Sequence, residues 1–244
     1  MLELCNAATL PPISKETEAG VRIASQIGIY GLAQPFFLVY KGEGGSVLSV
    51  LDGAATLLSG DDVDEALCFV AMMPQVTSLR SDAATATAFA AARGFAVRTG
   101  AVLKAPQGIE PTGNATAVLP ADFYPLANRV FYDGMPPYDV WYADVWQRLR
   151  REKCRLVAVY EGETPVSGGM TVAETDGAWL LGAICTDEAY RKRGYAAACV
   201  TALAAEGQRR NNDVYIAAKN EAAQHLYEGL GFTVCGTWGQ VDFK

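Results

Sequence analysis

Two segments of this chain resemble each other, and this repeat constrains the fold more than any other feature. DAATATAFAAARGFAVRTG spans residues 82–100, and KNEAAQHLYEGLGFTVCGT spans residues 219–237. Each segment is typical of an alanine-rich amphipathic helix that ends at a Gly-Phe pair and is followed by a short strand. Glycine ends a helix there because it adopts the left-handed conformation at little cost. The repeat therefore predicts a duplicated domain.

A turn-rich segment separates the two copies. APQGIEPTGNAT, residues 105–116, collects Pro, Gly, Thr and Asn and contains few apolar residues. This composition favours a linker. We therefore predict two domains, over residues 1–110 and 116–244.

Strand and helix patterns follow each other in both halves. Residues 155–163 and 164–172 predict a hairpin around Gly162, and residues 178–186 predict a further strand. The remaining predicted elements are helices over 123–131, 138–153, 194–210 and around Tyr227, strands over 36–42, 46–51, 54–59 and 213–219, and a short helix over 62–73. The predicted fold class is α/β with a mixed sheet.

The charge balance excludes partners that are bound through an extended basic face. The chain has 27 Asp and Glu against 20 Lys and Arg, which argues against nucleic acid and anionic membranes as binding partners.

The six cysteines form no C-x-x-C pair and mostly lie in apolar sequence. This favours reduced core thiols over disulfides or zinc and predicts no metal site. The chain begins without a basic segment followed by an apolar one, and no apolar run is long enough to span a membrane. We therefore expect a cytoplasmic protein.

One local cluster of positive charge interrupts this acidic chain. YRKRGYAAACV, residues 190–200, places three consecutive cations before Gly194, where a predicted strand ends and a helix begins. The first N–H groups of a helix have no internal partner and carry about half a positive charge, so they form an anion site. The small residues Gly194 and Ala196 leave the backbone open to a phosphate. The spacing is neither G-x-x-x-x-G-K-[ST] nor G-x-G-x-x-G, and it fits a pyrophosphate.

Two adjacent motifs resemble those of a known family. Residues 184–200, ICTDEAYRKRGYAAACV, resemble the acyl-CoA-binding motif of the GNAT N-acyltransferases, whose pattern is (Q/R)-x-x-G-x-(G/A) after a strand. Residues 213–232, DVYIAAKNEAAQHLYEGLGF, resemble that family's next motif, a strand, an asparagine and a helix with a tyrosine four residues before Gly-Phe. The resemblance covers residues 116–244, with Ala196 in place of the commoner glycine and Glu188 in place of a common proline. It implies tandem GNAT-like domains, each a mixed, mostly antiparallel twisted sheet flanked by helices.

The resemblance also implies acetyl-CoA (coenzyme A) as cofactor and assigns its contacts. Backbone N–H groups would hold the pyrophosphate, and the strand near Ile184 would pair with the pantetheine arm and offer an N–H to the thioester carbonyl. Asn220 would contact the arm, and Tyr227 would protonate the departing thiolate. The implied cofactor-binding residues are Ile184, Cys185, Thr186, Arg191, Lys192, Arg193, Gly194, Tyr195, Ala196, Asn220 and Tyr227.

Acyl transfer to an amine requires a neutral nucleophile. An amine of pKa near 10.4 is protonated at pH 7, and removing its proton costs about 4.6 kcal/mol, so a base or a desolvating pocket is expected near it. Glu174, Asp176 and Glu188 follow predicted strands and are the candidates, and Glu174 is taken as the catalytic base. A tyrosine of pKa near 10 is an adequate acid for a thiolate whose conjugate acid has a pKa near 8.5. His225 lies about 200° around the helix from Tyr227 and is expected to be structural.

The aromatic segment over residues 130–146 has two interpretations. It falls between two predicted helices that often shape the acceptor pocket in the resembled family, so Tyr138, Trp141 and Tyr142 are candidate substrate-binding residues. The same side chains can instead be core packing.

The first half carries acidic residues where a pyrophosphate loop would lie. SGDDVDEAL, residues 59–67, places Asp61, Asp62 and Asp64 at a helix start. Carboxylates there cap the helix and repel a phosphate. We therefore predict a degenerate GNAT-like domain without coenzyme A in the first half.

The predicted function is acetyl transfer from acetyl-CoA to an amine of a small molecule or peptide, by direct attack in a ternary complex. The protein is expected to be a monomer or a homodimer. A CoA-binding sensor or scaffold without chemistry is the alternative from another class, favoured by the lack of an obvious base. A longer acyl donor or an oxygen acceptor is a third hypothesis.

Overall fold

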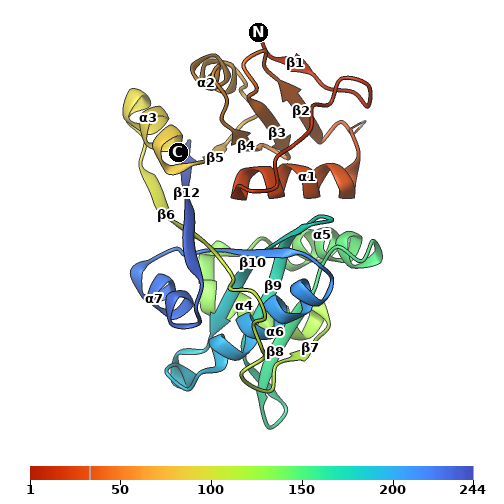
Figure 1. The fold of residues 1–244 in the computed structure, drawn as a ribbon, viewed down its shortest axis with the longest axis vertical. Coiled ribbons are helices and arrows are strands. Elements are labelled where there is room, and N and C mark those ends of the chain that lie inside the picture. Colours follow the sequence, from red (N-terminus) through yellow and green to blue (C-terminus); the bar gives the residue numbers. More distant parts are fainter. Residues whose placement is uncertain (33, 244) are drawn as a thin grey trace. The chain divides into compact units, whose positions relative to one another are not determined.

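The computed structural model describes residues 1–32 and 34–243, which form two compact units (Figure 1). The first unit contains Met1–Val102, Ala217–Asn220 and the residues from Cys235 onward, and the second contains Leu103–Ile216 and Glu221–Val234. The predicted α/β class with mixed sheets is confirmed. The compact units differ from the predicted domains 1–110 and 116–244. Ala217–Asn220 and the residues from Cys235 onward lie in the first unit, and residues 103–110 lie in the second.

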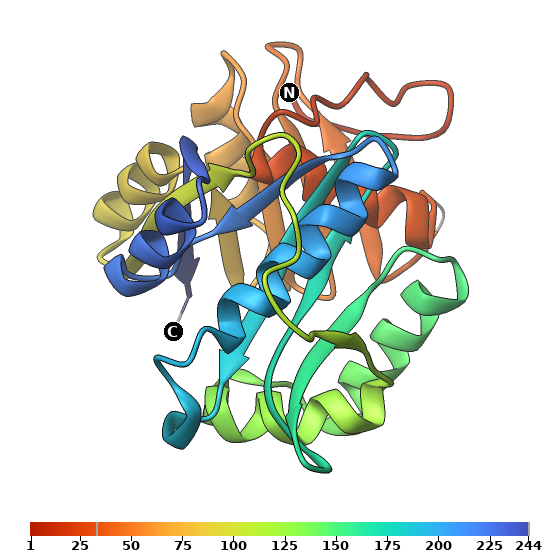
Figure 2. The same ribbon diagram turned by 60° about the horizontal axis from the view of Figure 1, so that its bottom comes forward.

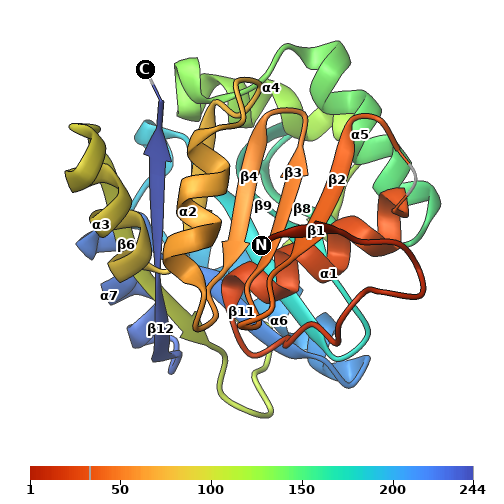
Figure 3. The same ribbon diagram turned by 90° about the horizontal axis from the view of Figure 1, so that it is seen from above.

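The first unit is a sheet with the strand order β1-β2-β3-β4-β5-β12-β6. The pairs β1–β2, β2–β3, β3–β4 and β5–β12 are antiparallel, and the pair β4–β5 is parallel. Figure 3 shows β2, β3 and β4 side by side. The elements are β1 (Glu3–Leu4), α1 (Glu18–Tyr30), β2 (Phe37–Lys41), β3 (Val47–Leu51), β4 (Ala54–Leu58), α2 (Val63–Ala71), β5 (Ser78–Ser81), α3 (Ala83–Arg93), β6 (Val97–Lys104) and β12 (Thr233–Asp242).

Both faces of this sheet are covered because its strands alternate apolar side chains between the faces. Val47 of β3 packs with Ile23 of α1 in one buried cluster. The neighbouring Leu48 packs in a second cluster with Val70 of α2 and Phe89 of α3. Helix α1 therefore covers one face, and α2 and α3 cover the other.

The second unit has the strand order β11-β10-β9-β8-β7 and one parallel pair, β10–β11. Its elements are β7 (Thr116–Ala117), α4 (Pro120–Phe131), the 3₁₀ helix η1 (Tyr132–Gly134), α5 (Tyr138–Arg150), β8 (Leu156–Glu161), β9 (Thr164–Glu174), β10 (Ala178–Thr186), the 3₁₀ helix η2 (Glu188–Tyr190), α6 (Tyr195–Arg209), β11 (Asp213–Ala217) and α7 (Glu221–Gly229).

Two consecutive glycines in β9 allow helices to approach both faces of this sheet. A Cβ added at Gly168 would lie 2.9 Å from the ring of Phe123 in α4. One added at Gly169 would lie 2.6 Å from Ile184 and 3.4 Å from Leu203 of α6. Helices α4 and α6 therefore cover opposite faces, and α6 is the blue helix crossing in front of the strands in Figure 2.

The repeated segments form the predicted helix–glycine–strand units. Helix α3 ends at Gly94 with a φ of 69°, and β6 follows; α7 is followed by Gly231 with a φ of 86°, and then by β12. The hairpin around Gly162 is also confirmed, with a φ of 61° at the glycine and antiparallel pairing of β8 with β9.

All six cysteines are free, and four of them are buried. The expectation of core thiols is wrong for Cys68 and Cys235, which are exposed. Within the described residues, none of the helices has the length and apolar character needed to cross a membrane.

The prediction that Asp62 caps its own helix is also wrong. Its carboxylate makes no side-chain cap on α2. It accepts hydrogen bonds from the N–H groups of Gly44 at 3.0 Å and Ser46 at 2.9 Å, in the turn between β2 and β3. Burial alone would raise the pKa of this carboxyl, but hydrogen bonds from the Ser46 side chain and from the Ser46 and Gly44 N–H groups outweigh burial and lower it.

Candidate functional site

The parallel strands β10 and β11 separate halfway along β10. Their pairing runs from Ala178–Asp213 to Leu181–Ile216. The pairing of β10 with β9 shifts between Gly182 and Cys185, and Ala183 in this bulge has a φ of 50°. Among the described residues, the second half of β10 therefore has no partner in β11. A bulge at such a point re-aims the backbone, which can offer its N–H and C=O groups to a ligand.

The predicted cationic loop follows this strand directly. Arg191, Lys192, Arg193 and Gly194 are exposed, and Gly194 with a φ of 81° is the N-cap of α6. No side chain caps the helix, so its first N–H groups face outward with the positive end of the helix dipole. A Cβ added at Gly194 would meet no atom within 4 Å. The positive φ, and not crowding, is what favours glycine in the ligand-free chain.

Contacts within the loop hold its cations beside the strand. The Arg191 Nε donates to the Thr186 carbonyl at 3.4 Å, and the Arg193 guanidinium lies 5.2 Å from the ring centroid of Tyr190. Tyr195, the first residue of α6, donates its hydroxyl to Glu161, and this bond raises the pKa of the tyrosine. The structure therefore brings together the predicted residues from Ile184 to Ala196.

This arrangement fits the cofactor that the sequence implies. A pyrophosphate carries negative charge, which suits an uncapped helix N-terminus beside three cations. A pantetheine arm carries amide groups, which suit a strand edge without a strand partner. The open space at Gly194 leaves room for a phosphate against the backbone.

Tyr227 belongs to the same compact unit and is buried in α7. Its ring packs at 6.2 Å from that of Phe232, and burial raises the pKa of its hydroxyl to about 12. The side chain therefore stays protonated at neutral pH, as a proton donor must. His225 is exposed. Asn220 is exposed and directly precedes α7, the helix that carries Tyr227.

The structure does not bring Glu174 to the bulge. Glu174 pairs with Trp179, five residues before Ile184, which corresponds to about 16 Å along the strand. It is buried, it bonds the Arg155 guanidinium at 3.2 Å and accepts from the Thr171 hydroxyl at 2.5 Å. Burial raises the pKa of its carboxyl. Its placement is that of a buried ion-pair partner at the far end of β10.

The other two candidate bases are exposed. Asp176 lies in the turn beside Glu174 and pairs with Lys153 at 2.8 Å. Glu188 lies in η2, on the side of the cationic loop. Neither lies on β10 near the bulge.

The two interpretations of the aromatic segment apply to different residues. Trp141 is buried and stacks on Phe123 with ring centroids 6.1 Å apart, which is core packing. Tyr138 and Tyr142 are more accessible and contact each other at 5.3 Å. Trp146 stacks on Tyr142 with ring centroids 5.9 Å apart and is 44% exposed. It was not among the predicted substrate-binding residues, although its i, i+4, i+8 spacing with the tyrosines marks one helix face.

Comparison with known proteins was consistent with this geometry. Residues 121–232 match the model of the acetyltransferase (GNAT) family. Among curated proteins, no sequence matches the chain. The chain is similar in structure to a GCN5-related N-acetyltransferase from Sphaerobacter thermophilus, with a TM-score of 0.64, 15% identity and coverage of 99% of this chain and 94% of that one.

Two other solved structures are similar over most of both chains. A GCN5-related N-acetyltransferase from Kribbella flavida has a TM-score of 0.62 and 15% identity, and the match covers 92% of this chain and 95% of that one. A tandem GNAT protein from the clavulanic acid biosynthesis pathway has a TM-score of 0.55 and 15% identity, and covers 96% of this chain and 90% of that one. At these identities the likeness is one of fold.

Proposed function

We propose, from the match of residues 121–232 to the model of the acetyltransferase (GNAT) family, that this chain transfers the acetyl group of acetyl-CoA to an amine by direct attack in a ternary complex. One observation carries the proposal. A strand separates from its parallel neighbour at a bulge and leads through three cations and a left-handed glycine into an uncapped helix. This sequence of elements can hold an anionic cofactor along one strand edge.

The backbone would supply most of the contacts to the cofactor. The N–H groups from Arg191 to Ala196 would hold the pyrophosphate, and the β10 edge from Ile184 to Thr186 would pair with the arm. When bound, acetyl-CoA supplies an activated acetyl thioester. The Ile184 N–H would polarise the reacting carbonyl, a type of contact often worth about 3 kcal/mol.

Tyr227 would hold a proton at its Oη and donate it to the departing sulfur. With a pKa of about 12, the phenol is a weaker acid than a thiol of pKa near 8.5, and full transfer in the ligand-free environment would cost about 4.8 kcal/mol. The hydroxyl can therefore lower the barrier mainly by hydrogen bonding as charge develops on sulfur.

No carboxylate is assigned as base in this proposal. Glu174 is committed to Arg155 at the far end of β10, and Glu188 lies on the cationic side of the strand. We assign removal of the amine proton to water.

Tyr138 and Tyr142 are the proposed contacts for an acceptor amine on a small molecule or peptide. The free cysteines support a cytoplasmic location.

Release of free thiol from acetyl-CoA tests this function. A panel of amines is added to the purified protein, and the steady rate of thiol appearance is measured for wild type, Tyr227→Phe and the control Tyr160→Phe. We expect at least one amine to give turnover, and Tyr227→Phe to lower kcat about 100-fold with unchanged acetyl-CoA affinity. Equal losses in kcat and affinity would contradict the acid role.

The same assay distinguishes acetyl transfer from the alternative function. None of the three candidate bases lies on β10 near the bulge, which favours a sensor or scaffold that binds the cofactor without chemistry. Stoichiometric acetyl-CoA binding with no thiol release across the whole panel would support that alternative and refute acetyl transfer.

A further inference from the structure

The first unit also contains a parallel strand pair that separates. Strands β4 and β5 pair from Ala54–Ser78 to Thr56–Arg80 and not beyond. A cavity of about 300 Å³ lies at the ends of these strands, lined by Leu57 and Leu58 of β4 and by residues of α1, β6 and β12. All its lining residues belong to the first unit. Its size falls at the lower end of the range for small-molecule sites.

The ionisable groups that line this cavity are acidic. They are the carboxyls of Glu16, Glu18 and Asp82 and the thiol of Cys235, and no lysine or arginine is among the described residues that line it. Burial would raise the pKa of Asp82, but hydrogen bonds from the Thr85 N–H and hydroxyl and from Ser59 outweigh burial and lower it. Asp82 is therefore ionised at neutral pH and offers a negative charge to a cation in the cavity.

Glu18 provides a buried acceptor without a donor. Its side chain is 2% exposed, and its Oε1 accepts from the Nε atoms of Arg22 and, at 2.7 Å, Arg80. Its Oε2 is buried and has no hydrogen-bond partner among the described residues. A buried carboxylate oxygen in that state is destabilising, and a donor that satisfies it is stabilising. Glu18 is one of the residues that line the cavity.

The remaining wall combines apolar side chains with the hydroxyl-bearing residues Thr17, Ser59, Ser81 and Thr237, and the adjoining loop does not suit a phosphate. Leu57, Leu58 and Val102 line the cavity with hydrocarbon. The loop after β4 leads to Asp62, whose carboxylate already occupies the Gly44 and Ser46 N–H groups. An anionic cofactor would meet carboxylates here, where the second unit presents three cations.

We propose that this cavity binds a small organic ammonium ion. The ammonium group donates to Glu18 and Asp82, and the hydrocarbon body packs on Leu57 and Val102. The site lies wholly within the first unit and does not depend on acetyl transfer by the second.

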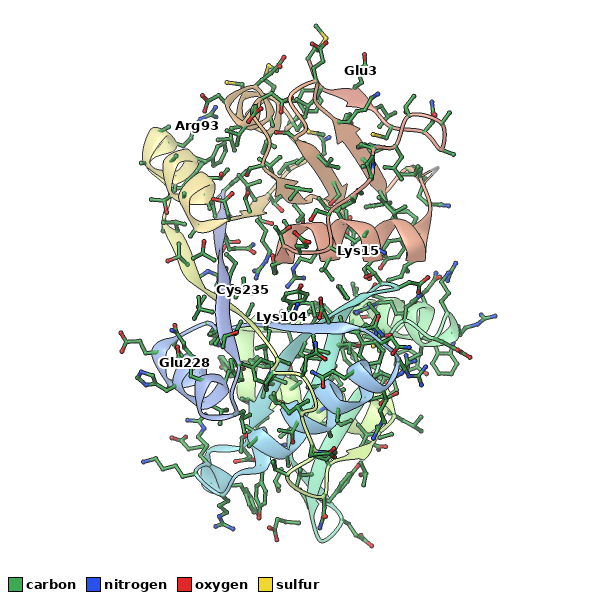
Figure 4. The ribbon with its side chains drawn as sticks, in the orientation of Figure 1. Glu3, Lys15, Arg93, Lys104, Glu228 and Cys235 are labelled. Atoms are coloured by element: carbon green, nitrogen blue, oxygen red, sulfur yellow. The ribbon has the colours of Figure 1, made fainter. Side chains whose placement is uncertain are left out.

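Two exposed cysteines give the test a built-in control. Cys235 of β12, labelled in Figure 4, lines the cavity, whereas Cys68 of α2 does not. The full chain is alkylated with N-ethylmaleimide, and the rate at each cysteine is measured by mass spectrometry. Cyclohexylammonium, cyclohexanol and cyclohexanecarboxylate serve as probes of equal shape and different charge. We expect only the ammonium to slow alkylation at Cys235, by at least about threefold at saturation, with no change at Cys68.

A charge-removing variant tests the contact with Asp82. Asp82 caps α3 by accepting from Thr85, and asparagine is an equally good cap, so Asp82→Asn is expected to fold. We expect it to raise the ammonium concentration needed for half-protection about tenfold, and the exposed control Asp64→Asn to leave it unchanged. Protection by all three probes alike, by none of them, or only by acetyl-CoA would overturn the proposal, as would an Asp82→Asn variant that is protected like wild type.

Discussion

Replacement of Gly194 by leucine tests the anion site most directly. Gly194 has a φ of 81° and a ψ of 1°, where a leucine backbone costs about 1–2 kcal/mol. Its Cβ would meet no atom within 4 Å, so crowding adds nothing in the ligand-free chain. Gly94 is a matched control, because it has a φ of 69° and a ψ of 26° and its Cβ would also meet nothing. Both leucine variants should therefore lose about 1–2 kcal/mol of unfolding free energy.

The two variants should differ in acetyl-CoA affinity. A leucine at 194 projects into the space before the first N–H groups of α6, which are the proposed pyrophosphate donors. Loss of two hydrogen bonds to a charged group, at about 1.5 kcal/mol each, would cost about 3 kcal/mol. This corresponds to about 150-fold in the dissociation constant. Gly94→Leu removes no such donor and should bind as wild type does.

Calorimetric titration with acetyl-CoA measures this difference, and urea denaturation checks that both variants carry the same conformational cost. We expect one site per wild-type chain, lost in Gly194→Leu and kept in Gly94→Leu. Wild-type affinity in Gly194→Leu, or an equal loss in both variants, would refute the anion site at the start of α6. Two sites per wild-type chain would refute the prediction that the first half lacks coenzyme A.

Three further outcomes follow from burial. Trp141→Ala should lose about 3–5 kcal/mol of unfolding free energy, because Trp141 stacks on Phe123 in the core, whereas Trp146→Ala should lose less than about 1 kcal/mol; equal losses in urea denaturation would contradict the assignment of Trp141 to the core. Burial raises the pKa of Glu174, so the folded state binds its proton more tightly than the unfolded state does. The unfolding free energy that this contributes should fall as the pH rises from 4.5 through the raised pKa. Glu174→Gln should remove this fall in denaturation at pH 4.5 and 7.5, and an unchanged fall would assign the pH dependence to another group. With the pKa of Tyr227 raised to about 12, the phenol stays protonated below that pH, so kcat/KM for a lysine-like amine should rise from pH 7 to 10; a descending limb between pH 8 and 9 would contradict it.

The elements that the sequence predicted well are those defined by neighbouring residues. The helix–glycine–strand repeats, the hairpin around Gly162 and the strand leading to the cationic loop all depend on spacing and on residues that tolerate a positive φ. Helix α1 was missed, although Thr17 caps it by accepting from the Gly20 N–H at 3.1 Å. That cap is a local signal and was available in the sequence.

The candidate site was predictable in part for the same reason. Residues from Ile184 to Ala196 are contiguous, so their order along the chain fixes a strand, a loop and a helix start. The position of Glu174 was not predictable, because it depends on which residue of β10 pairs with it across the sheet. Sequence spacing also could not show that Trp141 is buried and Tyr138 is exposed, because burial depends on the sheet that the helix covers.

The sequence by itself determined the α/β class, the repeat and the cationic loop at the start of a helix, because helix termini and turns are set by residues close along the chain. Only the tertiary structure placed β12 from the end of the chain beside β5 in the first unit. It also formed the cavity around Glu18 and moved Glu174 away from the bulge. These features arise from pairing and packing between residues far apart in the chain, where strand register, not local propensity, decides which side chains meet.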